Sequence, residues 1–104
     1  MTTEAEVEAE IKRKGLEAAR LTPDKIDAAI VSEQYIVPNG TVLTICILTL
    51  RNGFTVTGES APASRENFDA ELGQTIARRN AREKIWPLEG YLLKQRLYDT
   101  VTGA

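Results

Sequence analysis

The amino-acid sequence predicts an α+β fold, in which a three-stranded antiparallel β-meander is packed by N-terminal and C-terminal helices. Two observations support this fold class. Pro38-Asn39-Gly40 and Asn52-Gly53 are turn signals, and they separate three runs of β-branched and apolar residues. Segments with helical periodicity lie on both sides of these runs, which places helices before and after the sheet.

Two helices are expected before the strands. Thr3 and Glu6 have the spacing of a capping box, which predicts a helix over residues 4–14. Thr22 can cap a second helix and a proline follows it in the first turn, so we expect that helix at residues 23–30. The first helix carries only a short apolar stripe, and we expect it to fray or to pack on a partner.

Three strands are expected at residues 33–37, 42–50 and 54–59, with the second strand in the middle of the sheet. Because side chains alternate between the two faces of a strand, the middle strand carries apolar residues on both faces. Helices can cover one face, and we expect an identical subunit to cover the other, which predicts a homodimer. Gly58 in the third strand indicates a bulge or a close approach by another backbone.

A long helix is expected after the strands, with Ser64 or Asn67 as its N-terminal cap. Two apolar ladders run along it: Phe68, Leu72 and Ile76, and Ala77, Ala81 and Ile85. The ladders lie far apart on a helical wheel, so the helix is either contacted on two sides or changes partner along its length. Pro87 predicts a kink or break near residues 85–87, followed by a final helix over residues 88–98.

Composition and charge narrow the function classes. The net charge of −2 disfavours a dedicated nucleic-acid-binding protein, because neutralising phosphates supplies most of that affinity. The sequence contains no histidine and only one cysteine, Cys46, which excludes an intrachain disulfide and the usual zinc clusters. We expect Cys46 to behave as a small buried hydrophobe. We therefore expect no metal and no cofactor.

With 104 residues, the chain is expected to form a single α+β domain over residues 1–104, with frayed ends at residues 1–3 and 99–104. The N-terminal residues are acidic and lack the apolar segment of a signal peptide. The longest apolar run, near residues 42–50, is too short to span a bilayer. These features predict a cytoplasmic protein without membrane contact.

The most basic part of the chain is the predicted long helix. The candidates for binding an anion are Arg78, Arg79, Arg82 and Lys84, joined by Arg65, because guanidinium groups bind phosphate through two parallel hydrogen bonds. The alternative is an ordinary solvated helix face, whose arginines pair with acids one turn away. The residue pattern is compatible with both interpretations.

Trp86 and Tyr91 are candidate aromatic anchors of the C-terminal region. We interpret them as residues that pack around the helix break. The alternative is a contact with another protein, because Trp, Tyr and Arg dominate the binding energy of protein interfaces.

Four polar residues are candidates for lining a pocket: Thr57, Glu59, Ser60 and Glu89. The first three lie beside Gly58 and would surround any pocket that opens at that glycine. Glu59 and Glu89 could perform acid–base chemistry only if they lay close together with shifted pKa values. Glu89 could instead bind the free N–H groups near the start of the last helix. We expect no catalytic residue.

Several segments resemble a known protein family: Glu8 to Leu16, Thr22 to Ile30, Thr57-Gly58-Glu59-Ser60-Ala61, Asn67-Phe68-Asp69 and Trp86-Pro87-Leu88-Glu89-Gly90-Tyr91. Their order and spacing resemble the phage gene-product-49-like proteins, small proteins of tailed phages and of prophages in Gram-negative bacteria. The resemblance covers residues 8–97. It implies an origin in a phage rather than a mechanism, so it transfers no catalytic residue. Members often carry a cysteine where this chain has Pro62.

These observations predict a phage accessory protein that is not an enzyme and that binds a factor of the host. One alternative is a protein that sequesters a small nucleotide or another phosphate signal. A weak nucleic-acid-binding protein is the other alternative. The expected partners are a second copy of the chain and either a host protein or a small anionic ligand.

Overall fold

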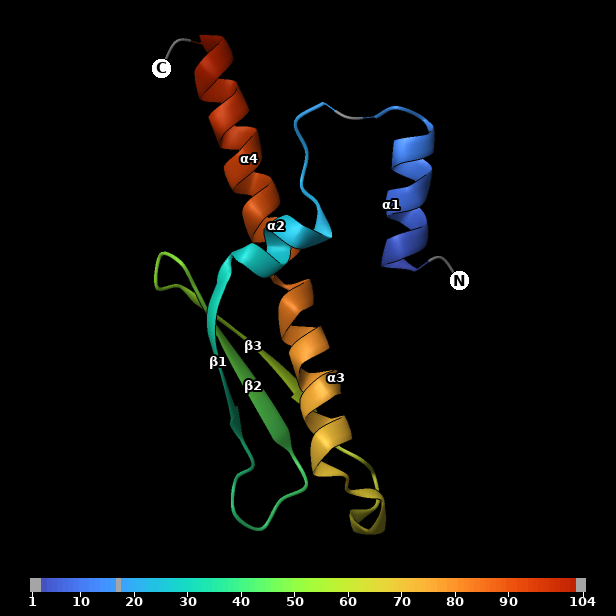
Figure 1. Cartoon of the computed structure of the whole chain (residues 1–104). Helices are drawn as coiled ribbons and strands as arrows, with labels where there is room; N and C mark the ends of the chain where they lie inside the picture. The colour runs from blue at the N-terminus through green and yellow to red at the C-terminus, as the bar shows by residue number, and fades with distance from the viewer. Residues whose placement is uncertain (1–2, 17, 103–104) are drawn as a thin grey trace.

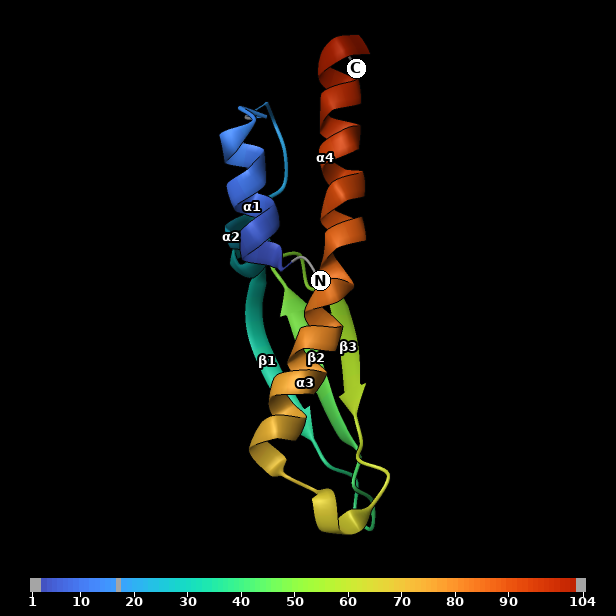
Figure 2. The same cartoon turned by 90° about the vertical axis from the view of Figure 1, so that its right-hand side faces the viewer.

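A computed structural model describes residues 3–16 and 18–102 (Figures 1 and 2). The elements follow in the order α1 (Glu4–Arg13), α2 (Pro23–Ala28), β1 (Ile30–Ile36), β2 (Thr44–Leu50), β3 (Thr55–Ser60), the 3₁₀ helix η1 (Arg65–Asn67), α3 (Ala70–Glu83) and α4 (Ile85–Thr102). The predicted α+β class and the three-stranded antiparallel sheet are confirmed.

The sheet is a meander in which β2 lies between β1 and β3. Both predicted turns contain a glycine with positive φ, +78° at Gly40 and +90° at Gly53, a conformation that glycine adopts without strain. β1 begins at Ile30, earlier than predicted, because α2 is shorter than predicted and the chain joins the sheet directly after it. At this junction the Ala29 carbonyl accepts a hydrogen bond of 3.0 Å from the Arg51 N–H.

α3 lies along β2 and β3 on one face of the sheet (Figures 1 and 2). The helix ladder of Ala77, Ala81 and Ile85 is fully buried, as are Cys46 and Leu48 of β2. These residues belong to one hydrophobic core, to which α2 adds Ile26. The other predicted ladder contributes less, because Leu72 at its centre is 55% exposed.

Gly58 allows α3 to approach β3 closely. A Cβ atom at this position would lie 2.8 Å from Ala81 Cα, and closer still to the Ala81 nitrogen and the Ala77 carbonyl oxygen. The predicted close approach of another backbone is therefore confirmed. Because the helix backbone fills this space, Gly58 does not open into a pocket.

In both views no helix lies on the opposite face of the sheet among the described residues (Figures 1 and 2). Ile45 and Ile47 of β2 are half-buried there, and Ile36 of β1 is 39% exposed. The cross-strand neighbours of Ile47 are polar, Gln34 on β1 and Thr57 on β3. The apolar part of this face is therefore small, and polar residues of β3 border it.

α1 is capped as predicted. The Thr3 hydroxyl accepts a hydrogen bond from the Glu6 N–H and the Glu6 carboxylate accepts one from the Thr3 N–H. Fraying at position 3 stays a prediction. The helix buries none of its residues. The prediction that N-terminal helices pack the sheet is therefore wrong for α1, because its apolar stripe is too short to join the core.

The N-terminal cap of α3 is Asp69, and the prediction of Ser64 or Asn67 is wrong. The Asp69 carboxylate accepts a hydrogen bond of 2.9 Å from the Leu72 N–H. Residues 65–67 form η1, and the backbone is extended between η1 and α3. The extended segment separates both predicted caps from the first turn of the helix.

The predicted helix break is confirmed but lies earlier in the chain. α3 ends at Glu83 with Lys84 as its C-terminal cap, and α4 begins at Ile85. Pro87 falls in the first turn of α4. Backbone N–H groups in a first turn have no partner within the helix, so proline costs no hydrogen bond there.

α4 continues to Thr102, beyond the predicted end at residue 98. In its last turns the Gln95 amide donates a hydrogen bond to Asp99, and the Thr100 hydroxyl donates one to the Arg96 carbonyl. Residues 99–102 are therefore helical in the structure, and their fraying stays a prediction. The other positions predicted to fray, 1–2 and 103–104, lie outside the described residues.

α4 projects beyond the sheet, and α1 stands apart from α4 at the same end of the molecule (Figures 1 and 2). The chain measures 55 Å in its longest direction, and its radius of gyration is 17.1 Å. A compact chain of this length has a radius of gyration of about 13 Å. The elongated shape leaves much of α4 without cover from the rest of the chain.

Candidate functional site

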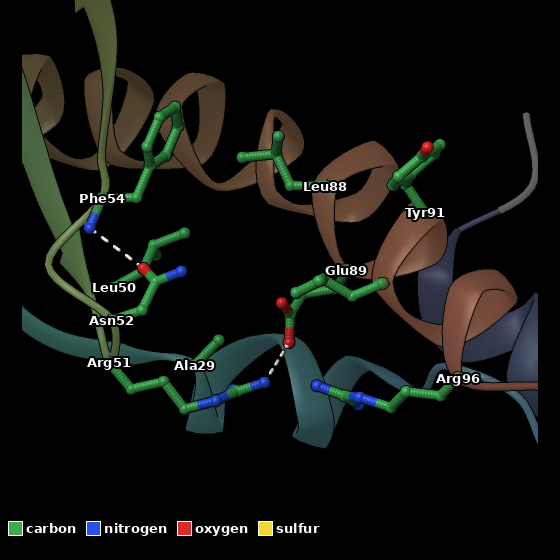
Figure 3. A pocket seen from close by; sticks show the side chains of 10 residues that line it. Ala29, Leu50, Arg51, Asn52, Phe54, Leu88, Glu89, Tyr91 and Arg96 are labelled. Atoms are coloured by element: carbon green, nitrogen blue, oxygen red, sulfur yellow. Dashed lines mark hydrogen bonds and ion pairs between the residues drawn. The ribbon is translucent and has the colours of Figure 1, made fainter. Parts of the chain in front are cut away.

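A groove lies between the β2–β3 hairpin and the first turns of α4 (Figure 3). Its volume is about 470 Å³, and most of its lining is apolar. The lining residues are Ala29, Leu50, Arg51, Asn52, Phe54, Leu88, Glu89, Tyr91, Leu92 and Arg96. A hollow of this size and character is typical of binding sites in proteins.

The hairpin holds one wall of the groove. The Asn52 side chain accepts a hydrogen bond of 3.0 Å from the Phe54 N–H, and the Leu50 N–H donates one of 2.8 Å to the Phe54 carbonyl. These bonds fix the turn, so that Phe54 stands at the groove with 55% of its surface exposed while Leu50 is buried below (Figure 3).

α4 supplies the other wall. Tyr91 is 72% exposed and Leu92 is 38% exposed, and both line the groove with Leu88. The prediction that Tyr91 is a packed anchor is wrong, because α4 runs on beyond Ile85 and carries Tyr91 past the end of the core. Trp86, in contrast, is half-buried and packs against the core.

The polar rim of the groove carries a net positive charge. The Arg51 guanidinium lies 2.7 Å from the Glu89 carboxylate, which is only 11% exposed. Arg96 reaches toward the same carboxylate from the next turns of α4 (Figure 3). The rim thus carries two arginines and one glutamate, and its net charge favours an additional carboxylate from a bound molecule.

A second and smaller cavity, of about 150 Å³, lies where α3 begins. Thr44 and Ser60 line it from the sheet, and Asp69 lines it from the helix. Thr44 is 1% exposed, and its hydroxyl has no hydrogen-bond partner among the described residues.

A third cavity, of about 400 Å³, contains three of the predicted anion-binding residues, Arg78, Arg79 and Arg82. Arg78 is already paired, because its Nε lies 2.9 Å from the Glu33 carboxylate. The hydrogen bond from Arg78 lowers the pKa of Glu33 below its ordinary value. Tyr35 lines this cavity and donates a hydrogen bond to Glu33; burial, with that bond, raises the pKa of Tyr35 to about 12.

Arg82 connects three segments of the chain. Its side chain is only 14% exposed and contacts Glu4 of α1 at 2.8 Å and Asp27 of α2 at 2.7 Å. It also donates a hydrogen bond to the Pro23 carbonyl. These contacts, first of all the one with Glu4, raise the pKa of Arg82. In this structure Arg82 holds α1 and α2 against α3.

The other predicted basic residues do not join this cavity. Arg65 donates a hydrogen bond to the Gly40 carbonyl at one end of the sheet, and Lys84 lies beyond the opposite end of α3. The predicted cluster of five cations is therefore divided. Anion binding by Arg78, Arg79 and Arg82 stays a prediction.

The four predicted pocket residues are also dispersed. Thr57 and Glu59 lie opposite Ile47 and Ile45 on the uncovered face of the sheet, and neither lines any of these three cavities. Ser60 lines the second cavity. Glu89 alone lies in the groove, where Arg51 pairs with it. Glu59 and Glu89 therefore occupy different elements and do not form an acid–base pair.

Sequence reasoning missed Arg51, Phe54 and Leu88 as site residues. The only local signal was the Asn52-Gly53 turn, which places Arg51 and Phe54 on either side of a hairpin. The position of Leu88 next to them depends on the direction of α4, which no local pattern indicates. Cys46 is fully buried, and burial raises the pKa of its thiol, as expected of a small hydrophobe in the core.

Among the described residues, none of the helices has the length and apolar character needed to cross a lipid bilayer. No curated protein and no solved structure matches the chain. A family model described as "Phage protein (N4 Gp49/phage Sf6 gene 66) family" matches residues 21–97, about three quarters of the sequence. The match includes the whole sheet, α3 and every residue that lines the groove. The chain therefore belongs to this family of phage proteins.

Proposed function

We propose that this phage protein is a non-enzymatic binding protein that acts, as a homodimer, on a protein in the cytoplasm of the infected bacterium. The groove between the hairpin and α4 is its docking site. The observation that carries this proposal is the exposure of large apolar side chains around one hollow, above all Phe54, Tyr91 and Leu92. Aromatic residues in such positions dominate the binding energy of protein interfaces.

The rim of the groove indicates the chemistry of the partner. The rim carries Arg51 and Arg96 but only one carboxylate, that of Glu89, which pairs with Arg51, so its net positive charge attracts a further acid. The walls below the rim are apolar. We therefore expect the host protein to insert a large apolar side chain that is followed closely by Asp or Glu.

The arginines of α3 support protein binding over anion binding. Arg78 and Arg82 already hold carboxylates of this chain, so a phosphate would have to displace them. A thermal-shift screen with nucleotides and inorganic phosphate tests the alternative functions. Stabilisation by one of these compounds that is lost in Arg79→Gln would favour a protein that sequesters a phosphate signal.

Site-specific cross-linking tests the docking site. A photoreactive phenylalanine analogue replaces Tyr91 in the protein expressed in host bacteria, and the matched control carries it at Val31, which is similarly exposed on β1. We expect one predominant host adduct from position 91 and none from position 31. The adduct is then identified, and the purified host protein is titrated with the phage protein by calorimetry.

Two variants make the result decisive. Leu92→Asp places a charge in the apolar wall, and we expect it to abolish binding of the identified host protein. Arg79→Asp changes an exposed residue of α3 away from the groove and should leave binding intact. Equal adducts from both cross-linker positions, or undiminished binding by Leu92→Asp, would exclude the groove as the docking site.

A further inference from the structure

The chain exposes more surface than a compact monomer of its size. Its accessible surface is 7296 Å² for a mass of 11.5 kDa. A monomeric protein of this mass exposes about 5,800 Å², so roughly 1,500 Å² per chain is in excess. Two chains could together bury about 3,000 Å², which is in the range of permanent dimers.

Exposed apolar side chains lie along α4, at the helical end of the molecule. A second apolar stripe, formed by Gly90, Leu93, Leu97 and Val101 at helical spacing, runs along α4. Leu97 is 41% exposed and Val101 is 87% exposed. Leu88 and Leu97 are nine residues apart, which corresponds to about two and a half turns, so this stripe and the groove occupy opposite sides of α4.

The stripe lies on the side of α4 that faces the N-terminal segment. Gly90, at the beginning of the stripe, is close to the Leu21 side chain of the loop before α2. α1 stands at this side, apart from α4 (Figure 2). Its own apolar residues are not buried either, because Val7 is 45% exposed and Ile11 is half-buried.

Ion pairs rather than a core hold α1 in place, through Glu4 with Arg82 and Glu8 with Arg20. A helix that buries none of its residues gains little from its own chain. Both α1 and the distal half of α4 therefore present apolar stripes that their own chain does not cover.

We propose that two copies of this chain associate through this helical end, with the Leu93–Leu97–Val101 stripes of the two α4 helices packed together and α1 of each copy beside them. The occupant is a second copy, because the excess area matches what a permanent dimer buries. This inference rests on the homodimer of the proposed function and does not depend on the host partner, since the groove lies on the other side of α4.

The uncovered face of the sheet is a poorer dimer surface. Its apolar part consists of Ile36 on β1 and of Ile45 and Ile47 on β2. The residues that face these two on β3 are polar. Three strands spaced about 4.8 Å apart form a face only about 14 Å wide. The helical end offers longer and more exposed apolar stripes.

Sedimentation velocity over a range of micromolar concentrations measures the association. We expect the wild-type protein to sediment as a species with twice the chain mass of 11.5 kDa. Leu97→Glu and Val101→Glu should each raise the dissociation constant by about 100-fold, because each change removes a buried apolar side chain from both chains at once. Val7→Glu should weaken the dimer by about tenfold, because α1 lies beside the contact rather than in its centre.

Two matched controls complete the experiment. Tyr91→Glu places the same charge on the groove side of α4, and Ile47→Lys places a charge on the uncovered sheet face. Both variants should remain dimers, and circular dichroism confirms that every variant is folded. A wild-type monomer would overturn both the homodimer and this interface. A dimer that Ile47→Lys dissociates and Leu97→Glu does not would overturn only the interface.

Discussion

Replacement of Gly58 by alanine tests the contact on which the fold depends. The inserted Cβ atom would lie 2.8 Å from Ala81 Cα, whereas carbon atoms in contact are normally about 3.5–4.0 Å apart. It would come closer still to two further backbone atoms of α3. Because the obstacle is helix backbone and not a flexible side chain, α3 must move away from β3 by roughly 1 Å.

The cost follows from this displacement. Overpacking of a tight core destabilises proteins by about 1–3 kcal/mol, and the rigid obstacle places Gly58→Ala near the upper end. Alanine has a lower conformational entropy than glycine in the unfolded state, and this difference stabilises the folded protein by about 0.4–1 kcal/mol. We expect a net loss of about 2 kcal/mol, or roughly 8–16 °C in melting temperature for a chain of this size.

Urea and thermal unfolding followed by circular dichroism measure this loss, with Gly90→Ala as the matched control. At Gly90 the nearest atom to an added Cβ is 3.7 Å away, which is ordinary contact. Alanine there improves helix propensity, so we expect a gain of up to about 1 kcal/mol. If Gly58→Ala melted within about 2 °C of the wild-type protein, the close approach of α3 to β3 would be refuted.

Three further changes test individual contacts. Arg82→Gln should lower the free energy of unfolding by about 1–3 kcal/mol and speed proteolysis of the loop after α1, because α1 loses its ion pair. The folded state favours the protonated Tyr35 phenol, so the free energy of unfolding of the wild-type protein should fall by at most about 3 kcal/mol between pH 10 and 12. Urea titrations at each pH measure this loss, and Tyr35→Phe should remove it. Thr44→Val should stabilise the protein by about 1 kcal/mol in thermal unfolding, because it removes a buried hydroxyl without a partner.

Each of these predictions has an outcome that contradicts it. Arg79→Gln changes an exposed arginine of the same helix, and an equal effect of both substitutions would show that Arg82 has no special role. A steep fall in the stability of Tyr35→Phe above pH 10, equal to that of the wild-type protein, would assign the transition to other groups. Destabilisation by Thr44→Val would show that its hydroxyl has a partner in solution.

Local patterns predicted the elements of the fold well. The Asn-Gly turns, the Thr3–Glu6 capping box and the cap at Thr22 all depend on residues within four positions of each other, and all are present in the structure. The boundaries were less accurate. Asp69 competes with Asn67 for the same helix end, and only the extended backbone before α3 decides between them.

The candidate site was less predictable, because charge pairing joins distant parts of the chain. Arg78 and Arg82 resemble an anion-binding patch in the sequence, but Glu33, Asp27 and Glu4 reach them from other elements. The groove depends on the direction in which α4 leaves α3.

The sequence by itself determined the class of fold and the order of the elements, because turns, caps and periodicity act over a few residues. Only the tertiary structure decided which arginines form ion pairs within the chain, where Tyr91 points and which surfaces stay uncovered. These properties depend on contacts between segments up to 78 residues apart, such as Glu4 with Arg82. Such contacts form only when the whole chain has packed, so no local pattern specifies them.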